Sequence, residues 1–147
     1  MPVKLFSLLQ RGEPVRLGDC EVSPDEVLGP ARRGLSFLYA TDTRPVQTIA
    51  EAGRDTDLMI LEGMYGAEED LPKALKNRHM LSRESAALAR EAGTARLLLT
   101  HFSTAVEDPG TLLPPAREIF PETDCAHDGM TLTLGWTEKR MAEERNG

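Results

Sequence analysis

Short apolar runs alternate with longer amphipathic stretches between residues 35 and 120, and this pattern predicts strands separated by helices. Strands are expected at 35–40, 57–61 and 96–100. Helices are expected at about 44–53, from 68–70 to a stop near 79, at 83–92 and at about 112–120. Such alternation is typical of right-handed βαβ units, so the pattern predicts an α/β fold with a largely parallel sheet.

Turn and cap residues mark the ends of these elements. Thr43 is expected to cap the first helix, with Pro45 in its first turn, and Ser82 to cap the helix that Gly93 ends. Two short strands, at 123–126 and 130–134, are expected to form a hairpin, because the Asp-Gly pair between them favours a tight turn.

The length of 147 residues predicts a single domain over 1–147 with a sizeable core. Residues 1–34 show little sustained periodicity and are expected to form an irregular segment, and the charged tail at 137–147 is expected to fray. No apolar run is long enough for a membrane span, and no signal-peptide pattern opens the chain, so a cytoplasmic protein is expected.

A net charge of −7 and a pI near 5.0 argue against a protein that coats nucleic acid by bulk electrostatics. Residues 73–96 nevertheless carry six basic side chains against two acidic ones. A solvated helix face and a local anion-binding surface both fit this segment. Cys20 and Cys125 lie far apart in the sequence and are expected to be reduced thiols rather than a bridge.

Three predicted strands run into chemically useful side chains at their carboxyl ends. Asp42, Glu62 and His101 would meet at one edge if the strands are parallel, and ligands of open α/β sheets bind at such edges. Asp42 can cap a helix or bind a metal ion, and His101 can be a hydrogen-bonded structural residue or a ligand. These two residues alone do not define a metal site.

A set of short motifs resembles the carboxyl-terminal half of ribonuclease Z. The motifs are Val-Leu-Gly-Pro at 27–30, Thr-Asp-Thr-Arg-Pro at 41–45, Leu-Glu-Gly-Met-Tyr at 61–65, His-Met-Leu-Ser-Arg-Glu-Ser-Ala at 79–86, Leu-Thr-His-Phe-Ser at 99–103 and Asp-Gly-Met at 128–130. The resemblance extends from Pro2 to about Leu134. It implies half of a metallo-β-lactamase αββα sandwich, with a mixed sheet and helices packed on one face.

The resemblance also implies a zinc-dependent endoribonuclease that uses two zinc ions to process the 3′ end of precursor tRNA. Asp42 matches the metal-bridging aspartate, and His101 matches the last metal-ligand histidine. His79 matches a histidine outside the metal shell that helps to protonate the leaving group. Glu62 occupies the place of a catalytic glutamate in a His-Glu-Ala-Thr loop, although the neighbouring residues differ.

Arg78 and Arg83 flank His79 and are expected to contact RNA phosphates. As an alternative for His79 itself, a histidine at a helix end can simply interact with the helix dipole.

The family's His-x-His-x-Asp-His signature is missing from this chain, whose histidines are His79, His101 and His127. The first hypothesis is therefore a half-enzyme that is inactive alone and needs an amino-terminal half. The alternative hypothesis is a non-catalytic interaction or structural module, or a truncated metallo-hydrolase fragment, that pairs with itself through its open sheet face. On either hypothesis a homo-oligomer is expected for the chain alone.

Overall fold

The computed structural model describes residues 3–29 and 34–135, which divide into two compact units at Leu35. The predicted frayed tail at 137–147 lies outside the described residues, and the prediction of a single domain stays a prediction. Within the described ranges, no helix is both long and apolar enough to cross a membrane.

The first unit contains regular elements, so the prediction of an irregular segment over 1–34 is wrong for its described residues. Its elements are α1 (Val3–Gln10), β1 (Val15–Leu17), β2 (Cys20–Val22) and α2 (Pro24–Val27). Strands β1 and β2 pair antiparallel. Leu9 of α1 and Val15 of β1 are buried, and α1 contacts β1, so the unit has a small apolar core. Its elements are too short to show the sustained periodicity on which the prediction relied.

The second unit is built on a four-stranded sheet in the order β3-β4-β5-β6. The strands are β3 (Phe37–Ala40), β4 (Leu58–Glu62), β5 (Leu97–Thr100) and β6 (Thr123–Cys125). Every neighbouring pair is parallel, so the predicted α/β class is confirmed, whereas the expected mixed sheet is a purely parallel one in the described residues.

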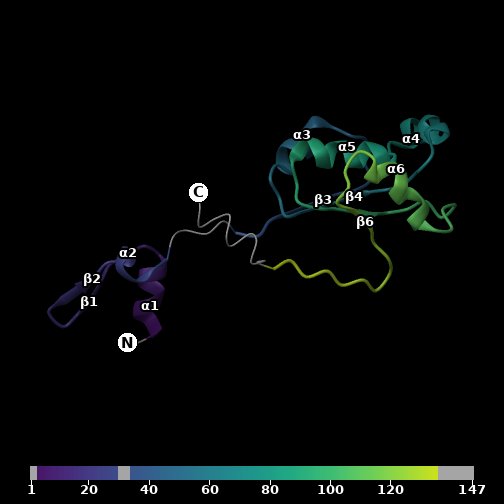
Figure 1. Ribbon diagram of the computed structural model, residues 1–147. Helices are drawn as coiled ribbons and strands as arrows, with labels where there is room; N and C mark the ends of the chain where they lie inside the picture. Colours follow the sequence, from purple (N-terminus) through teal and green to yellow (C-terminus); the bar gives the residue numbers. More distant parts are fainter. Residues whose placement is uncertain (1–2, 30–33, 136–147) are drawn as a thin grey trace. The chain divides into compact units, whose positions relative to one another are not determined.

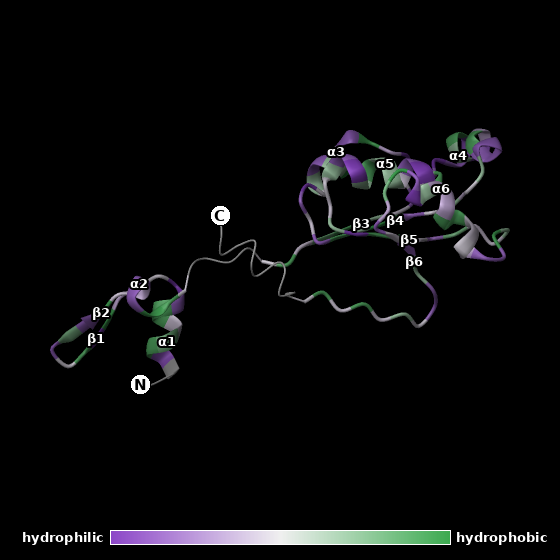
Figure 2. Cartoon of the chain, in the orientation of Figure 1, coloured by the Kyte–Doolittle hydropathy of each residue, from purple (hydrophilic) through white to green (hydrophobic). Residues whose placement is uncertain are grey.

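The helices of the second unit cover one face of this sheet (Figure 1). They are α3 (Gln47–Ala52), the 3₁₀ turn η1 (Glu68–Asp70), α4 (Leu71–Asn77), α5 (Ser82–Ala92), the 3₁₀ turn η2 (Pro109–Leu112) and α6 (Leu113–Arg117). Helix α5 packs on α3, α6, β4 and β5 and is the centre of this layer. In Figure 2 apolar and polar residues alternate along these helices, as expected of helices with one buried face.

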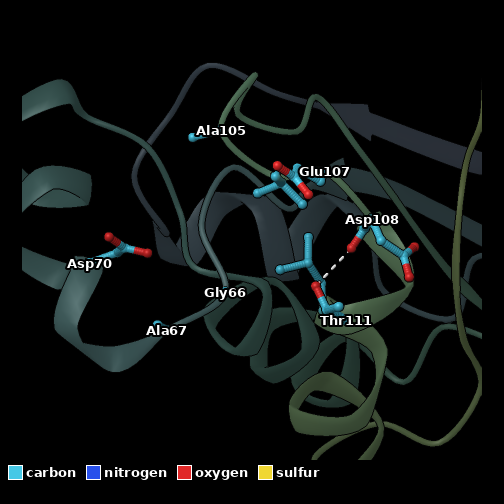
Figure 3. Close-up of a pocket in the computed structure, with 9 residues that line it drawn as sticks. Gly66, Ala67, Asp70, Ala105, Glu107, Asp108 and Thr111 are labelled. Atoms are coloured by element: carbon cyan, nitrogen blue, oxygen red, sulfur yellow. Dashed lines mark hydrogen bonds between the residues drawn. The ribbon is translucent and has the colours of Figure 1, made fainter.

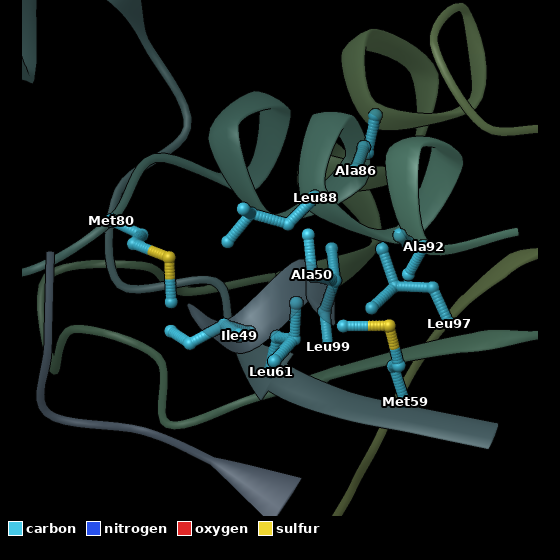
Figure 4. Close-up of a cluster of buried hydrophobic side chains, with 12 residues drawn as sticks. Ile49, Ala50, Met59, Leu61, Met80, Ala86, Leu88, Ala92, Leu97 and Leu99 are labelled. Carbon is cyan, nitrogen blue, oxygen red and sulfur yellow. The ribbon is translucent and has the colours of Figure 1, made fainter. Parts of the chain in front are cut away.

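The core lies between the helices and the sheet (Figure 4). Alternate residues of β4 and β5 point into it, and Met59, Leu61 and Leu99 are fully buried. The small residues Ala86 and Ala89 let α5 approach the sheet closely. The alternation of side chains along a strand therefore places Met59 and Leu61 on the helix side and leaves Leu58 and Ile60 on the opposite face.

Several predicted element ends are wrong. Helix α3 begins at Gln47 rather than near 44, with Val46 as its N-cap, because the Thr43 N–H donates to Glu62 instead of opening a helix. Ser82 is the first helical residue of α5, and Leu81 is the N-cap. Gly93 ends α5 with φ +65°, as predicted.

The predicted hairpin after α6 is also wrong. Strand β6 pairs only with β5, in parallel, and none of the residues 130–135 lies in a strand. The Asp128-Gly129 turn does form, with Gly129 at φ +77°, but the chain then runs on beneath the sheet (Figure 1). Helix α6 ends at Arg117, earlier than the expected 120.

Candidate metal centre

The carboxyl ends of β3, β4 and β5 form the edge that carries the candidate site. Asp42 lies two residues beyond β3, Glu62 is the last residue of β4, and His101 directly follows β5. Because these strands are parallel and in register, the three side chains meet at one edge, as predicted. His79 joins them from the short connection between α4 and α5.

The backbone at this edge adopts unusual conformations. Asp42 has φ +59° and His101 has φ +53°, in the left-handed region that residues with a side chain rarely adopt. Arg78, directly before His79, has φ +64° and forms the C-cap of α4. Such conformations persist where the surrounding contacts hold them, and they often occur at functional sites.

Asp42, His79 and His101 are close enough to bind one metal ion. One ligand atom from each lies within 4.8 Å of the others. His101 Nε2 lies 3.5 Å from Asp42 Oδ2, and His79 Nδ1 lies 4.0 Å from Asp42 Oδ1. The two imidazole rings have centroids 5.5 Å apart. The Asp42 side chain is 70% exposed, so this cluster opens to solvent.

Glu62 lies behind the cluster and is fully buried. Its Oε2 is 2.8 Å from His79 Nδ1 and 3.3 Å from His101 Nδ1. Its Oε1 accepts the Thr43 and Met80 N–H groups, each at 3.1 Å. A carboxylate only accepts hydrogen bonds, so each ring donates to Glu62 through Nδ1. For His101 this leaves Nε2 on the side of Asp42.

The donor set fits a divalent metal such as zinc. Imidazole nitrogen and carboxylate oxygen are ordinary zinc ligands, and catalytic zinc sites use three protein ligands plus an open position. A carboxylate behind the ring nitrogen is the usual support for a metal-binding histidine. The structure thus brings together His79, Asp42 and His101, although the sequence placed only the last two in the metal shell.

The remaining residues that the sequence singled out are not members of this cluster. Arg83 in α5 pairs with Glu68 at 2.8 Å, and Arg78 is exposed. His127 is exposed in its turn, as expected of a solvated residue. Burial above all raises the pKa of the Cys125 thiol to about 11.

Two residues that the sequence reasoning missed support the site. The Arg44 guanidinium donates to the His79 carbonyl and to both carboxylate oxygens of Glu84. Arg44 lies inside the Thr-Asp-Thr-Arg-Pro motif, and this was the only signal in the sequence that pointed to it.

A separate hollow of about 620 Å³ lies between the loops that follow β4 and β5 (Figure 3). Carboxylates of Asp70, Glu107 and Asp108 line it together with small and apolar residues. Asp108 is occupied within its own turn, where it accepts the Gly110 N–H at 2.8 Å. None of the four residues of the candidate centre lines this hollow.

Known proteins of similar sequence are ribonuclease Z enzymes by name. The chain is 46% identical to ribonuclease Z of Clostridium botulinum (strain Alaska E43 / Type E3) over 134 residues, which cover 91% of this chain and 42% of the relative. It is 40% identical to ribonuclease Z of Lachnospira eligens over 139 residues, which cover 95% of this chain and 46% of the relative. The resemblance inferred from the motifs is confirmed, and the chain spans less than half the length of these relatives. No family model matches the chain.

Solved structures of similar fold are metallo-β-lactamase fold proteins. The YhfI protein of Bacillus subtilis, described as a metallo-β-lactamase fold protein, superimposes with a TM-score of 0.59 at 28% identity, over 65% of this chain and 39% of that one. The short form of human tRNase Z superimposes with a TM-score of 0.56 at 20% identity, over 79% of this chain and 37% of that one. The expected metallo-β-lactamase fold class is therefore confirmed.

Proposed function

We propose that this chain, which is homologous to part of ribonuclease Z, supplies one side of the active site of a zinc-dependent endoribonuclease that processes the 3′ end of precursor tRNA in the cytoplasm. One observation carries the proposal: Asp42, His79 and His101 lie together, and the buried carboxylate of Glu62 holds both histidines. A nuclease of this kind needs metal ligands and a proton donor beside each other, and this cluster offers both types of side chain.

Asp42 and His101 are the residues that would hold zinc, Asp42 through its carboxylate and His101 through its imidazole. A bound zinc ion supplies Lewis acidity to a phosphodiester. The residues of this chain fix the positions of the ligands, since Glu62 holds the His101 ring at Nδ1 and leaves Nε2 towards Asp42. The carboxylate of Glu62 therefore orients the His101 ring towards Asp42.

His79 is the proposed proton donor to the leaving oxygen. Its Nδ1 is engaged by Glu62, so Nε2 is the atom from which a proton would pass. Because Glu62 is fully buried and its oxygens already accept four hydrogen bonds, we assign it a positioning role and not direct contact with substrate.

Arg78 and Arg83 are the proposed contacts to RNA phosphates. Arg78 is exposed next to His79, and Arg83 lies in the first turn of α5. Replacing either arginine should weaken binding to all tRNA sequences alike. It should also reduce the slope of the logarithm of the binding constant against the logarithm of the salt concentration by about 1.

The test is reconstitution with an amino-terminal half that carries His-x-His-x-Asp-His. The 147-residue chain alone should cleave precursor tRNA very poorly, because most ligands are missing, and the mixture should cleave it with full sensitivity to a chelator. Asp42→Ala or His101→Ala in the mixture should remove zinc and activity together. Chelator-sensitive cleavage by the chain alone would contradict the half-site proposal.

A second candidate function is a non-catalytic module that pairs with a partner half or a second copy through the open face of the sheet. Phe37 and Tyr39 of β3 point away from the helices and are 64% and 60% exposed. A hollow of about 460 Å³ lies on the same face, between the sheet and residues 126–134. Exposed aromatic side chains around an apolar hollow are typical of a surface that binds another protein.

A further inference from the structure

Arg44 links the two loops that carry the candidate ligands. It lies two residues after Asp42, and its Nη1 donates to the carbonyl oxygen of His79 at 2.5 Å and to Glu84 Oε2 at 2.8 Å. Its Nη2 donates to the other carboxylate oxygen of Glu84. One planar guanidinium therefore binds a carboxylate with two bonds and the backbone of the second loop with a third.

Glu84 extends this link to the start of α5. Its Oε2 accepts the Leu81 N–H at 2.9 Å as well as the bond from Arg44. The side chains of Arg44 and Glu84 are each 24% exposed, so the pair is mostly shielded from water. Shielding strengthens such a charge-assisted contact relative to an exposed ion pair.

The loops that Arg44 joins contain residues in the left-handed backbone conformation. The His79 connection is only four residues long, Arg78 to Leu81, and it opens in the left-handed conformation of Arg78. Asp42 also sits in the left-handed region. Glu62 also ties both loops to one side chain, because its Oε1 accepts the Thr43 N–H of one loop and the Met80 N–H of the other.

We propose that Arg44 and Glu84 are positioning residues that lock the Asp42 loop to the His79 loop, so that the proposed ligand Asp42 and the proposed proton donor His79 keep their spacing. Neither side chain belongs to the metal-binding group, so the pair acts through the backbone of the loops. The effect of this pair on catalysis rests on the proposed function, whereas the hydrogen bonds that join the two loops do not.

The test compares Arg44→Lys with a matched variant, Arg117→Lys, in the full chain. Arg117 makes the same kind of contact, to the Thr123 carbonyl and the Asp124 carboxylate, but at the amino-terminal end of β6. Lysine keeps the charge and the stem but loses the planar fork. Arg44→Met removes every polar contact of this side chain, so it should change each measurement below more than Arg44→Lys does. Glu84→Gln removes the negative charge of the partner.

The first measurement is amide hydrogen exchange in the metal-free chain, resolved by NMR at Thr43 and Met80. Arg44→Lys should speed exchange at both amides by about tenfold or more, while Arg117→Lys leaves them within about twofold of the wild type. Adding Glu84→Gln to Arg44→Lys should give little further acceleration, because the pair acts as a unit. Unchanged exchange at Thr43 and Met80, or equal acceleration at the β4 and β5 amides, would overturn the proposal.

The second measurement is the affinity of the same variants for zinc alone, by competition with a chromophoric chelator. Arg44→Lys should weaken zinc binding by about 10- to 100-fold, the usual effect of losing an outer support, and Arg117→Lys should not. If the wild-type chain alone binds no zinc, as its missing ligands allow, the same competition is run on the mixture with the amino-terminal half. A mixture that binds no zinc would overturn the proposed metal centre, and the exchange measurement would still decide the positioning role. Wild-type zinc affinity in Arg44→Lys would overturn that role at the site.

Discussion

At the scale of single residues, Glu62 explains how a solvent-facing site keeps its geometry. Its carboxylate is fully buried, yet two backbone N–H groups and two imidazole rings surround it. A buried carboxylate without such partners would be strongly unfavourable, so the ring orientations and the burial of Glu62 depend on each other. The exposed Asp42 then completes a cluster whose other members are already oriented.

The first residue-scale prediction separates a ligand from a proton donor in the reconstituted enzyme. His79→Ala should keep its zinc but slow the chemical step by about 10²–10⁴-fold, the usual contribution of a general acid. Asp42→Ala should lose zinc and activity together. Metal analysis beside single-turnover cleavage makes the comparison. If His79→Ala loses zinc as completely as Asp42→Ala, His79 is a third ligand, as its position within 4.8 Å of the others would allow.

The second residue-scale prediction concerns Cys125 and alkaline pH. Burial, with smaller contributions from Asp124 and Asp108, raises the pKa of this thiol from 9.0 to about 11, against the opposing effect of Arg117. Between these values the unfolded chain releases the proton and the folded chain keeps it. The stabilisation is therefore complete below pH 9 and is lost as the pH rises through about 11.

Urea unfolding of the wild type and of Cys125→Ala between pH 8 and 11.5 checks this prediction. The stability difference between the two proteins should shrink as the pH rises. Cys20→Ala, at an exposed thiol, is the control for removing one cysteine. A difference that stays constant across this range would show that the folded protein does not retain the Cys125 proton.

At the scale of elements, helix ends determine where the site residues project. Helix α4 ends on Arg78 and α5 ends on Gly93, both in the left-handed conformation. Only Gly93 has the residue type that adopts this conformation without cost. Arg78 precedes His79 and turns the chain at the end of α4 in a conformation that is unfavourable for a residue with a β-carbon. Gly93 turns the chain at the end of α5 without this cost.

These two helix ends predict opposite effects of substitution on stability. Gly93→Ala should lower the free energy of unfolding by about 1 kcal/mol, because the left-handed conformation penalises a β-carbon. Arg78→Gly should raise it by about 0.5–1 kcal/mol for the same reason. Chemical denaturation of the metal-free chain measures both. A destabilised Arg78→Gly variant would mean that the arginine side chain itself holds the turn.

At the scale of the whole molecule, the second unit has one covered and one uncovered face. Helices α3, α5 and α6 bury one side of the sheet, and among the described residues of this unit 126–134 lie along the other (Figure 2). Although the chain carries a net negative charge, the aromatic side chains of Phe37 and Tyr39 are exposed on this second face. The half-enzyme and self-pairing proposals both place a partner here.

This uncovered face predicts self-association of the chain when no partner half is present. Sedimentation velocity at tens of micromolar should show a dimer or larger species, and Phe37→Lys with Tyr39→Lys should shift it towards monomer. Leu75→Lys is the matched control, because Leu75 is an exposed apolar residue, 57% accessible, on α4. A wild-type chain that stays monomeric would contradict self-pairing through this face.

The sequence alone determined the order of the strands and helices in the second unit, the parallel sheet and the edge at which Asp42, Glu62 and His101 meet. These features follow from local patterns, because hydrophobic periodicity decides the element type and parallel strands bring their carboxyl ends together. The ribonuclease Z motifs added His79 to that edge.

The tertiary structure decided how those residues are held. Glu62 contacts residues 17 and 39 positions away, and Arg44 contacts residues 35 and 40 positions away. No periodicity encodes such pairs, since they depend on where the chain returns after each helix. The same holds for residues 130–134, which an Asp-Gly turn suggested as a strand. A local turn signal cannot supply a hydrogen-bonding neighbour, and only the assembled sheet shows that β6 pairs with β5 on one side and leaves these residues outside the ladder.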